Sequence, residues 1–514
     1  MSVDSKHPDY VSSLAEWQLI ADVGGGEAEI KRLGKKYLPA TEGMVLDGLG
    51  TGQPGAIAYE AYLSRAVFPN YFGDGVETCL GMMHREDAQI TVPERMRPML
   101  DSITPDGESA LMLLRRMNEA QLRSGRIGLL LDVPTAAAGA EVLPYVATYC
   151  AESIINWDDG TRSQGKQSLE LVVLDEKGWE RDADFQWAEV EKWRVLARSG
   201  VAATIDSAEQ DAPASGEFMV AVADKEVGLS ALDFSAPMLR GRTLDFIPFV
   251  FLNARDLLPT PDRPPMSELA RLCLAIYRGE ADRRQALYRQ GQDTLVVIGA
   301  EDGGLEGGGG ANVTTDAAGN SYAASDGTRI GAGSRLDVPL NGDAKFIGVS
   351  GSGLTEARLC IESDREQAAS LAAKVLEGTD GNQQSGAALR IRVGSRTASL
   401  HQIALASAEA LQQLLRWAAV WLGYSDAEVE SVVVEPNLDF SEQHMAPREV
   451  LELVQAKQAG APLSWRSVHS LFRERGVTLL SYEEEVDEIA GEVSPGGDGL
   501  GVPDEPGAGS GGAV

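Results

Sequence analysis

The chain has little of what metal centres and disulfide frameworks need. Of its 514 residues, four are cysteines and five are histidines. The cysteines form no Cys-x-x-Cys pair, so the sequence predicts free, mostly buried thiols in a reducing compartment. The histidines stand singly and form no His-Glu-x-x-His motif, which favours structural or surface roles. We therefore expect no disulfide, no metal site and no bound cofactor; the residues concerned are Cys79, Cys150, Cys273, Cys360, His7, His84, His401, His444 and His469.

Long apolar runs are also missing. Nowhere do about 18 apolar residues follow one another, as a bilayer-spanning helix needs. Residues 1–13 lack the basic segment followed by an apolar stretch that marks a secretory leader. We expect no membrane partner and a protein that is made in the cytosol.

Basic residues are scarce: 45 Lys and Arg stand against 77 Asp and Glu, a formal net charge of -32. Tight DNA binding depends on Lys and Arg at the phosphates, so this balance argues against a protein that grips DNA or reads its sequence. The balance is compatible with a surface past which DNA slides, because repulsion keeps the polymer from adhering.

Catalytic motifs are absent as well. Residues 160–166 (GTRSQGK) match a phosphate-binding loop as far as Lys166, but Gln167 stands where Ser or Thr would hold magnesium. The segment leads into a strand pattern, so no helix N-terminus faces a phosphate, and we interpret it as a hairpin turn. There is no Gly-x-Ser-x-Gly elbow, and no carboxylate pair stands out from the many acidic residues. We therefore expect that the chain is not an enzyme.

Length and composition predict several lobes, since 514 residues with 43% hydrophobic residues exceed one ordinary core. Before residue 259 the apolar periodicity is first helical and then strand-like, which predicts an α+β lobe. Helices are expected at 59–65 and 108–123, and strands at 127–133, 145–149, 169–174, 190–197, 218–222 and 246–252.

A proline-rich break at residues 259–265 precedes a predicted helix from Ser267, as its cap, to Gln290. A strand at 294–299 and a segment rich in Gly, Asn, Asp and Ser follow. The next predicted helix, 354–377, has charged faces and one narrow apolar stripe, a pattern typical of packing against similar neighbours. The stripe consists of Leu354, Ala357, Ile361, Ala368, Leu371 and Val375.

The last part of the chain is predicted to be helical and then disordered. After a polar break at 379–384, apolar spacing predicts a long tract from 385 to 422, kinked or interrupted at Gly394. From Glu483 onward the chain has nine acidic residues and no Lys or Arg, so this end is expected to be disordered. Between these two parts we expect a strand at 431–435 and helices at 447–458 and 465–475.

A local basic patch stands where the long tract begins. It consists of Arg390, Arg392 and Arg396. Pairing with carboxylates of a neighbouring subunit is favoured over contact with DNA phosphates, since no wider basic stripe accompanies the three residues.

Specific stretches resemble those of a known family. They are residues 59–68 (YEAYLSRAVF), 143–146 with 155–157, 246–249 followed by 269–270, 277–278 and 281–282, and 385–388 (SGAA) before the long helix. Their sequence, together with the order mixed lobe, helix, β segment, helix, polar loop, long helix and terminal helices, resembles that of tailed-bacteriophage portal proteins. The stretches sample the chain from residue 59 to about residue 440.

The resemblance implies an α+β portal fold and a ring, commonly of twelve subunits, through which double-stranded DNA is packaged and ejected. The DNA-facing residues would be Lys374, Thr379, Asp380, Asn382, Gln383 and Gln384. The implied parts are a wing at 1–259, a first stem helix at 260–292, a clip at 293–353, a second stem helix at 354–378, a tunnel loop at 379–386, a wing helix and strand at 387–440, a crown at 441–492 and a disordered tail at 493–514.

The resemblance also implies partners. These are other copies of the chain, a large terminase on the clip, a head-completion or adaptor protein, the major capsid protein, scaffold, and DNA bound without sequence specificity. The implied place is the virion neck at the unique head vertex, after assembly in the host cytoplasm. ATP hydrolysis would belong to the terminase, in agreement with the missing nucleotide motif.

Two alternatives stay open. A ring adaptor or minor head protein would be smaller and would lack two helices that bracket a β segment. A DNA-processing ATPase or nuclease would use Lys166; it would be discarded if ATP with magnesium failed to bind and Lys166→Ala had no effect.

Overall fold

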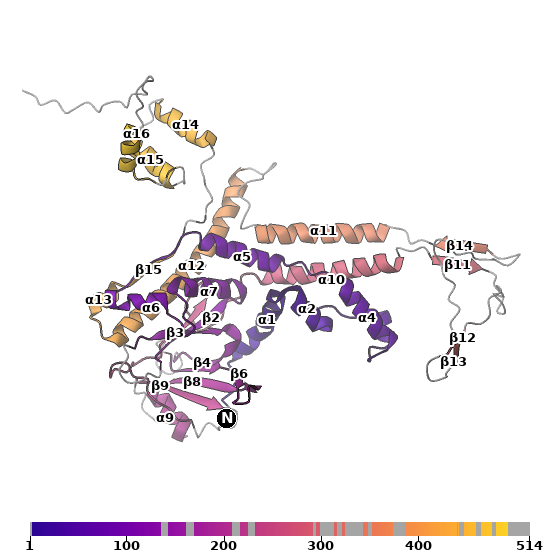
Figure 1. The fold of residues 1–514 in the computed structure, drawn as a ribbon, viewed down its shortest axis with the longest axis horizontal. Coiled ribbons are helices and arrows are strands. Elements are labelled where there is room, and N and C mark those ends of the chain that lie inside the picture. Colours follow the sequence, from indigo (N-terminus) through magenta and orange to yellow (C-terminus); the bar gives the residue numbers. More distant parts are fainter. Residues whose placement is uncertain are drawn as a thin grey trace, which may run out of the picture. The chain divides into compact units, whose positions relative to one another are not determined.

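A computed structural model describes residues 3–134, 142–160, 169–207, 216–224, 232–290, 294–298, 313–315, 321–323, 343–347, 352–373, 386–438, 440, 447–458, 464–474, 478 and 480–491. The chain divides into two compact units, Met1–Leu438 and Asp439–Val514 (Figure 1). Helices and strands mix throughout unit 1, which confirms the α+β class.

Helices make up the first part of unit 1. The first of them begins behind His7, whose Nδ1 accepts a hydrogen bond from the Asp9 N–H at 3.1 Å. The His7 ring also stacks on Trp157 at 4.0 Å, so the start of the chain is fixed to a strand far along the sequence. The helices are α1 (Pro8–Gly24), α2 (Gly26–Leu33), α3 (Glu42–Leu46), α4 (Pro54–Arg65), α5 (Tyr71–Met83), α6 (Arg97–Asp101) and α7 (Ala110–Arg123).

Two antiparallel sheets follow. The first has the order β10-β2-β3 and the second the order β4-β5-β8-β9. A separate hairpin, β6 with β7, lies in the sequence between β5 and β8. The strands are β2 (Arg126–Asp132), β3 (Tyr145–Cys150), β4 (Ile154–Asp158), β5 (Leu171–Asp175), β6 (Gly178–Arg181), β7 (Trp187–Val190), β8 (Lys192–Arg198), β9 (Phe218–Asp224) and β10 (Phe249–Asn253), with helix α9 (Ser199–Ser207) before β9.

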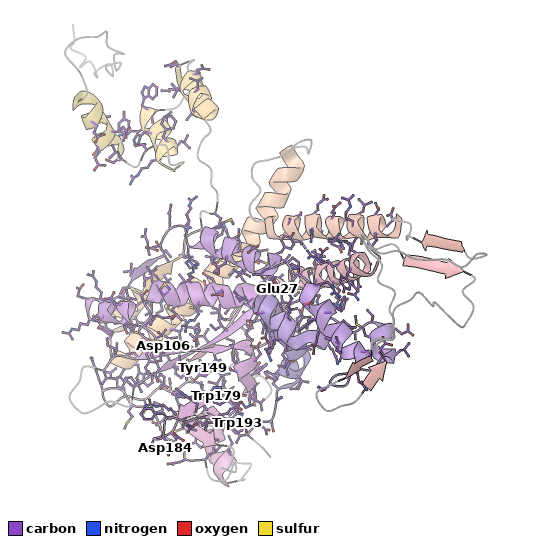
Figure 2. All side chains as sticks on the ribbon, turned by 45° about the vertical axis from the view of Figure 1, so that its right-hand side comes forward. Glu27, Asp106, Tyr149, Trp179, Asp184 and Trp193 are labelled. Carbon is purple, nitrogen blue, oxygen red and sulfur yellow. The ribbon has the colours of Figure 1, made fainter. Side chains whose placement is uncertain are left out.

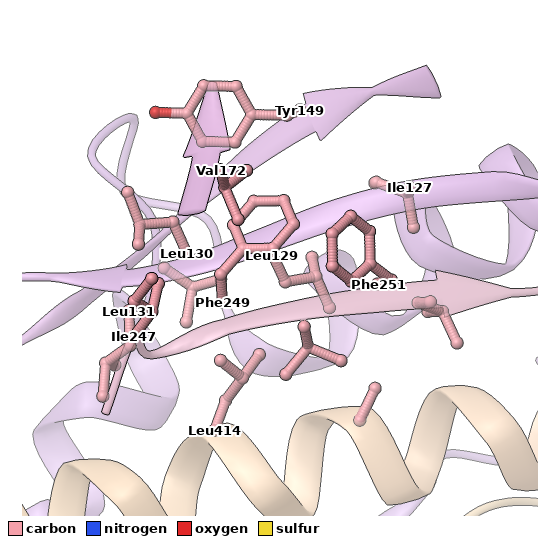
Figure 3. Packing of buried hydrophobic residues seen from close by; sticks show 14 of the residues in the cluster. Ile127, Leu129, Leu130, Leu131, Tyr149, Val172, Ile247, Phe249, Phe251 and Leu414 are labelled. Atoms are coloured by element: carbon pink, nitrogen blue, oxygen red, sulfur yellow. The ribbon is translucent and has the colours of Figure 1, made fainter. Parts of the chain in front are cut away.

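The main core lies on both faces of the first sheet. Every residue of β2 and β10 is buried, as expected for strands covered on two sides. Figure 3 shows Leu414 of the long helix on one side of β10, while Phe249 and Phe251 rise from the other side toward Val172 and Tyr149.

A buried polar network ties α7 to this sheet and to the long helix. Asn118 Nδ2 donates to Ser407 Oγ at 2.8 Å and to Gln121 Oε1 at 3.0 Å. Gln121 Nε2 donates to the Asn253 carbonyl at 2.7 Å. The Asn118 amide oxygen lies 2.9 Å from His84 Nε2, so this nitrogen carries the proton.

The rest of unit 1 contains a helix pair and the long helix. The bounds are α10 (Ser267–Gln290), β11 (Thr294–Ile298), β12 (Val313–Thr315), β13 (Ser321–Ala323), β14 (Asp343–Ile347), α11 (Ser352–Ala373), α12 (Gly386–Leu422), α13 (Asp426–Glu430) and β15 (Val433–Glu435), which pairs with β1 (Gln89–Thr91). None of the helices within these described ranges is long and apolar enough to cross a membrane.

Unit 2 contains three helices among its described residues: α14 (Pro447–Gln458), α15 (Trp465–Glu474) and α16 (Tyr482–Gly491). The predictions for α14 and α15 are confirmed. The prediction of disorder from Glu483 is wrong for residues up to Gly491, because α16 begins at Tyr482. Ser481 caps that helix: Glu484 N–H donates to Ser481 Oγ, and Ser481 N–H donates to Glu484 Oε2 at 2.8 Å. Acidic residues in a first helical turn are stabilised by the helix dipole, which explains the outcome.

Two further predictions need correction. Helix α12 continues through Gly394, so the predicted interruption is wrong, because one glycine costs only about 1 kcal/mol and does not stop a helix of this length; the alternative of a kink stays a prediction. The thiols divide evenly: Cys79 and Cys273 are buried, and Cys150 and Cys360 are exposed. Residues 161–168 lie outside the described residues, so the interpretation of residues 160–166 as a hairpin turn stays a prediction; the strands on either side, β4 and β5, are antiparallel neighbours.

Candidate functional site: the helix pair of α10 and α11

Helix α10 is anchored along one face to the helices at the start of the chain. Tyr62 donates its hydroxyl hydrogen to Asp282 Oδ1 at 2.5 Å. Arg278 Nε donates to the Tyr37 carbonyl at 2.8 Å. Before these polar contacts along α10, Cys273 and Tyr277 are fully buried. The helix is therefore a rigid extension of the core.

Helix α11 runs back along α10 (Figure 1), since the two are joined through the antiparallel strands β11 and β14. The close approach is at Gly279, where a Cβ would lie 3.3 Å from Ile361 Cγ1. Among the described side chains of α11, Ile361 and Ala368 are the buried ones. These two residues are seven apart, so α11 buries only a narrow seam, and it packs against α5 as well as against α10.

A buried carboxylate lies beside this seam. Glu280 of α10 is 1% exposed. Its oxygens accept hydrogen bonds from Arg283 Nη2 at 2.8 Å and from Arg284 Nε at 2.7 Å. Arg365 of α11 contributes a third cation, with Nη2 3.7 Å from Glu280 Oε2. Burial raises the pKa of Glu280, but the hydrogen bonds from Arg283 and Arg284 and their charges outweigh it, so that this pKa lies below its ordinary value.

The far side of α11 is open. Leu359 is 47% exposed there. Arg358 Nη1 and Glu362 Oε1, 3.2 Å apart, form an ion pair on the same surface. Between the two helices lies a groove of about 640 Å³ whose lining includes Ala286, Leu354 and Cys360. Exposed apolar groups between paired charges are suited to contact with another protein surface.

None of the site residues predicted from the sequence is a described side chain of the α10–α11 pair. Lys374, Thr379, Asp380, Asn382, Gln383 and Gln384 lie outside the described residues. Arg390, Arg392 and Arg396 lie in the first turns of α12, whose backbone is described there and whose side chains are not. Their contact with DNA or with a neighbouring subunit stays a prediction.

The sequence analysis missed the cluster around Glu280. A signal was present: Glu280 is followed by arginines three and four positions later, the spacing at which side chains meet on a helix. The contribution of Arg365 could not be read from the sequence, because it depends on the register of α11 against α10. Within the described residues, no group of His, Cys, Asp and Glu is placed to hold a metal ion.

Comparison with known proteins gives a partial family match and distant structural likenesses. A family model described as a domain of unknown function (DUF4055) matches residues 265–422, which run from α10 to the end of α12. No curated protein matches the chain.

Three solved structures are similar to this chain at low sequence identity. One, titled "Neck of native GTA particle computed with C12 symmetry", is 15% identical, with 78% of this chain and 90% of that chain covered and a TM-score of 0.34. A second, "Virion of native gene transfer agent (GTA) particle", is 14% identical, with 84% and 98% covered and a TM-score of 0.36. A third, "Neck of empty GTA particle computed with C6 symmetry", is 14% identical, with 79% and 89% covered and a TM-score of 0.33. The chain is thus similar, over the segment that holds the helix pair, to a family with no assigned function.

Proposed function

We propose that this chain is a structural subunit of a phage-type head–neck ring, and more specifically a portal protein in which α10 and α11 are the stem. The observation that carries the proposal is the helix pair: α10 is fixed to the core, while α11 extends beside it with one narrow seam buried. The resemblance of residues 59 to about 440 to portal proteins supports it.

A ring accounts for the open side of α11. The helix spans about 33 Å at 1.5 Å per residue, and a helix of this length draws most of its stability from packing. In a cyclic ring every subunit meets its neighbour through the same head-to-tail contact, so one exposed helix face suffices to close the assembly. Leu359 and the Arg358–Glu362 pair would then be covered by the next subunit.

The clip, the wing and the tunnel loop of the proposed ring would have separate roles. Residues 293–353, between the two helices, would be the clip that receives a terminase and a head-completion protein, and the wing would face capsid protein and scaffold. DNA would pass the loop at 379–386 without being held, since the chain's charge of -32 opposes phosphate binding. The subunit would work in the virion neck and carry out no chemistry itself.

The test is the mass of the purified full-length protein by light scattering, paired with end-on negative-stain images. A ring of about a dozen subunits with a central hole is expected. Leu359→Arg should abolish the ring because it buries an unpaired charge in each interface. The matched control is Leu46→Arg, since Leu46 lies on α3 and is 81% exposed. Particles without a channel, or equal behaviour of the two variants, would contradict the proposal.

A ring adaptor or minor head protein is the second candidate. The presence of both α10 and α11 around the segment 294–347 favours the portal, because the adaptor is not expected to have two such helices. The two differ in a pull-down with purified large terminase, which a portal ring binds and an adaptor does not. If the chain were an ATPase or nuclease, Lys166→Ala should abolish ATP binding. The strand β5 follows residues 160–166 where a phosphate-binding loop would be followed by a helix, which argues against this alternative.

A further inference from the structure

The hairpin of β6 and β7 carries large aromatic side chains that its own chain leaves in solvent. Trp179 is 65% exposed, Phe185 74% and Trp187 63%. Figure 2 labels Trp179 and, from the turn, Asp184. All residues of β6, and all but the last residue of β7, are exposed, so the hairpin adds nothing to the core. Three aromatic side chains of about 200 Å² each, two-thirds exposed, make an apolar patch of about 400 Å², the size at which surface patches are often functional.

The strand register places these side chains together. Arg181 pairs with Trp187 and Trp179 pairs with Glu189. Partners in an antiparallel ladder project to the same face, and residues two apart along a strand do so too. Trp179, Arg181, Trp187 and Glu189 therefore share one face. The Arg181 guanidinium lies over the Phe185 ring at 5.0 Å, which brings the turn aromatic to the same patch.

The turn holds Phe185 in a conformation that is unfavourable for a bulky L-residue, with φ at 63°. It is held there by Asp182, whose Oδ1 accepts hydrogen bonds from the Asp184 N–H at 2.9 Å and from the Gln186 N–H at 2.8 Å. Asn or Gly would fit this position with less strain. An exposed phenylalanine at a strained turn does not stabilise the fold, and such positions concentrate where proteins contact ligands.

Charge decides which occupant fits. Residues 175–192 contain seven acidic side chains and three basic ones. Asp182 and Asp184 lie in the turn and Glu189 lies on the aromatic face itself. Phosphate backbones and anionic bilayers are repelled by such a rim, and so is the same acidic hairpin of a second copy. A cationic protein surface is attracted.

We propose that the face formed by Trp179, Phe185 and Trp187 is a docking site for a different protein, one that presents apolar side chains flanked by Lys or Arg. The aromatic rings supply the buried centre of the contact, and Asp184 and Glu189 supply its acidic rim. This site does not depend on the proposed ring, because it lies on a different element from α10 and α11.

The test is selection of random 12-residue displayed peptides on the full-length protein, with depletion on the triple variant Trp179→Ser, Phe185→Asn and Trp187→Thr. Asn is chosen at 185 because it tolerates positive φ. Enriched peptides should combine aromatic or branched apolar residues with Lys or Arg. A synthetic peptide from the selection should bind at least tenfold more weakly to the triple variant by fluorescence anisotropy, and more weakly at 300 mM than at 50 mM salt.

Two controls separate the causes. Leu46→Ser removes an exposed apolar side chain elsewhere and should leave peptide binding unchanged. Asp184→Lys with Glu189→Lys keeps the aromatic rings and should remove the preference for basic peptides. Acidic or absent consensus peptides, or equal binding to the triple variant, would overturn the proposal. So would a changed oligomeric state of the triple variant, or binding of duplex DNA or phosphatidylcholine vesicles that the triple variant loses, since these results would identify a different occupant.

Discussion

Replacing Glu280 by Gln removes the charge at the centre of the α10–α11 contact while keeping the shape of the side chain. The carboxylate accepts hydrogen bonds from Arg283 and Arg284, and it faces Arg365 across the seam. Hydrogen bonds to charged groups are worth about 1.5–3 kcal/mol. The Arg283 and Arg284 side chains are 24% and 42% exposed, so water can replace part of their hydrogen bonding to the Glu280 carboxylate. We expect a loss of about 2 kcal/mol, near the low end.

The assay is hydrogen exchange followed by mass spectrometry, because a chain with two units does not unfold in one step. Exchange of the α10 amides around Glu280 should be about 30-fold faster in Glu280→Gln at pH 7, because the lost hydrogen bonds lie within α10 and each 1.4 kcal/mol corresponds to a factor of ten. Amides of α7 should not change. The matched control, Glu362→Gln, breaks a solvent-exposed pair with Arg358 and should change exchange by about twofold.

The pH dependence provides the refutation. The folded-state pKa of Glu280 is lowered, so the folded protein binds fewer protons than the unfolded chain between the two pKa values. The stabilisation is therefore present above the unfolded pKa and is lost as pH falls through the folded pKa. The difference in amide exchange rate between wild type and Glu280→Gln should become smaller below about pH 4. An exchange rate of these α10 amides within threefold of wild type at pH 7, or a difference independent of pH, would refute the reasoning.

Three further outcomes are expected. Burial raises the pKa of the Cys79 thiol to about 12 and that of Cys273 to about 11, so at pH 8 a thiol reagent should label Cys360 first and these two only after unfolding. Burial lowers the pKa of Arg126 to about 9; in thermal unfolding Arg126→Met should stay within about 1 kcal/mol of wild type, whereas Arg126→Ala should lose about 3 kcal/mol by leaving a cavity. Burial also lowers the pKa of His84, so stability should decline as pH falls below 6.5, and in His84→Gln that part of the decline, measured by urea unfolding, should vanish.

The sequence predicted the helices and strands whose periodicity follows directly from burial. The helix predicted at 267–290 is α10, and Ser267 is its first residue. The strand predicted at 294–299 is β11, and the strands at 127–133 and 145–149 are β2 and β3 within two residues. These elements have apolar side chains on the sides that become buried, so local pattern and tertiary structure agree.

Elements that depend on distant partners were not predicted. Helix α1 is fixed by the stacking of His7 on Trp157, 150 positions apart along the chain, and no local pattern contains that contact. The hairpin of β6 and β7 has no alternation toward a core, since Trp179 and Trp187 both point to solvent. A pattern analysis that equates aromatic residues with burial cannot identify such a hairpin.

The packing partner of α11 in the candidate site could not be predicted from the sequence either. The apolar stripe of α11 was correctly read from Leu354, Ile361 and Ala368, but the stripe predicts one packing partner and does not say which helix takes that place. In the structure Ile361 packs at Gly279 of α10, Leu354 lines the groove between the helices, and α11 also contacts α5. Leu359 lies off the stripe, between charged residues, and is 47% exposed. The periodicity of apolar residues therefore predicts the main packing face of such a helix. A second interface can be recognised only once the structure shows which face the first one uses.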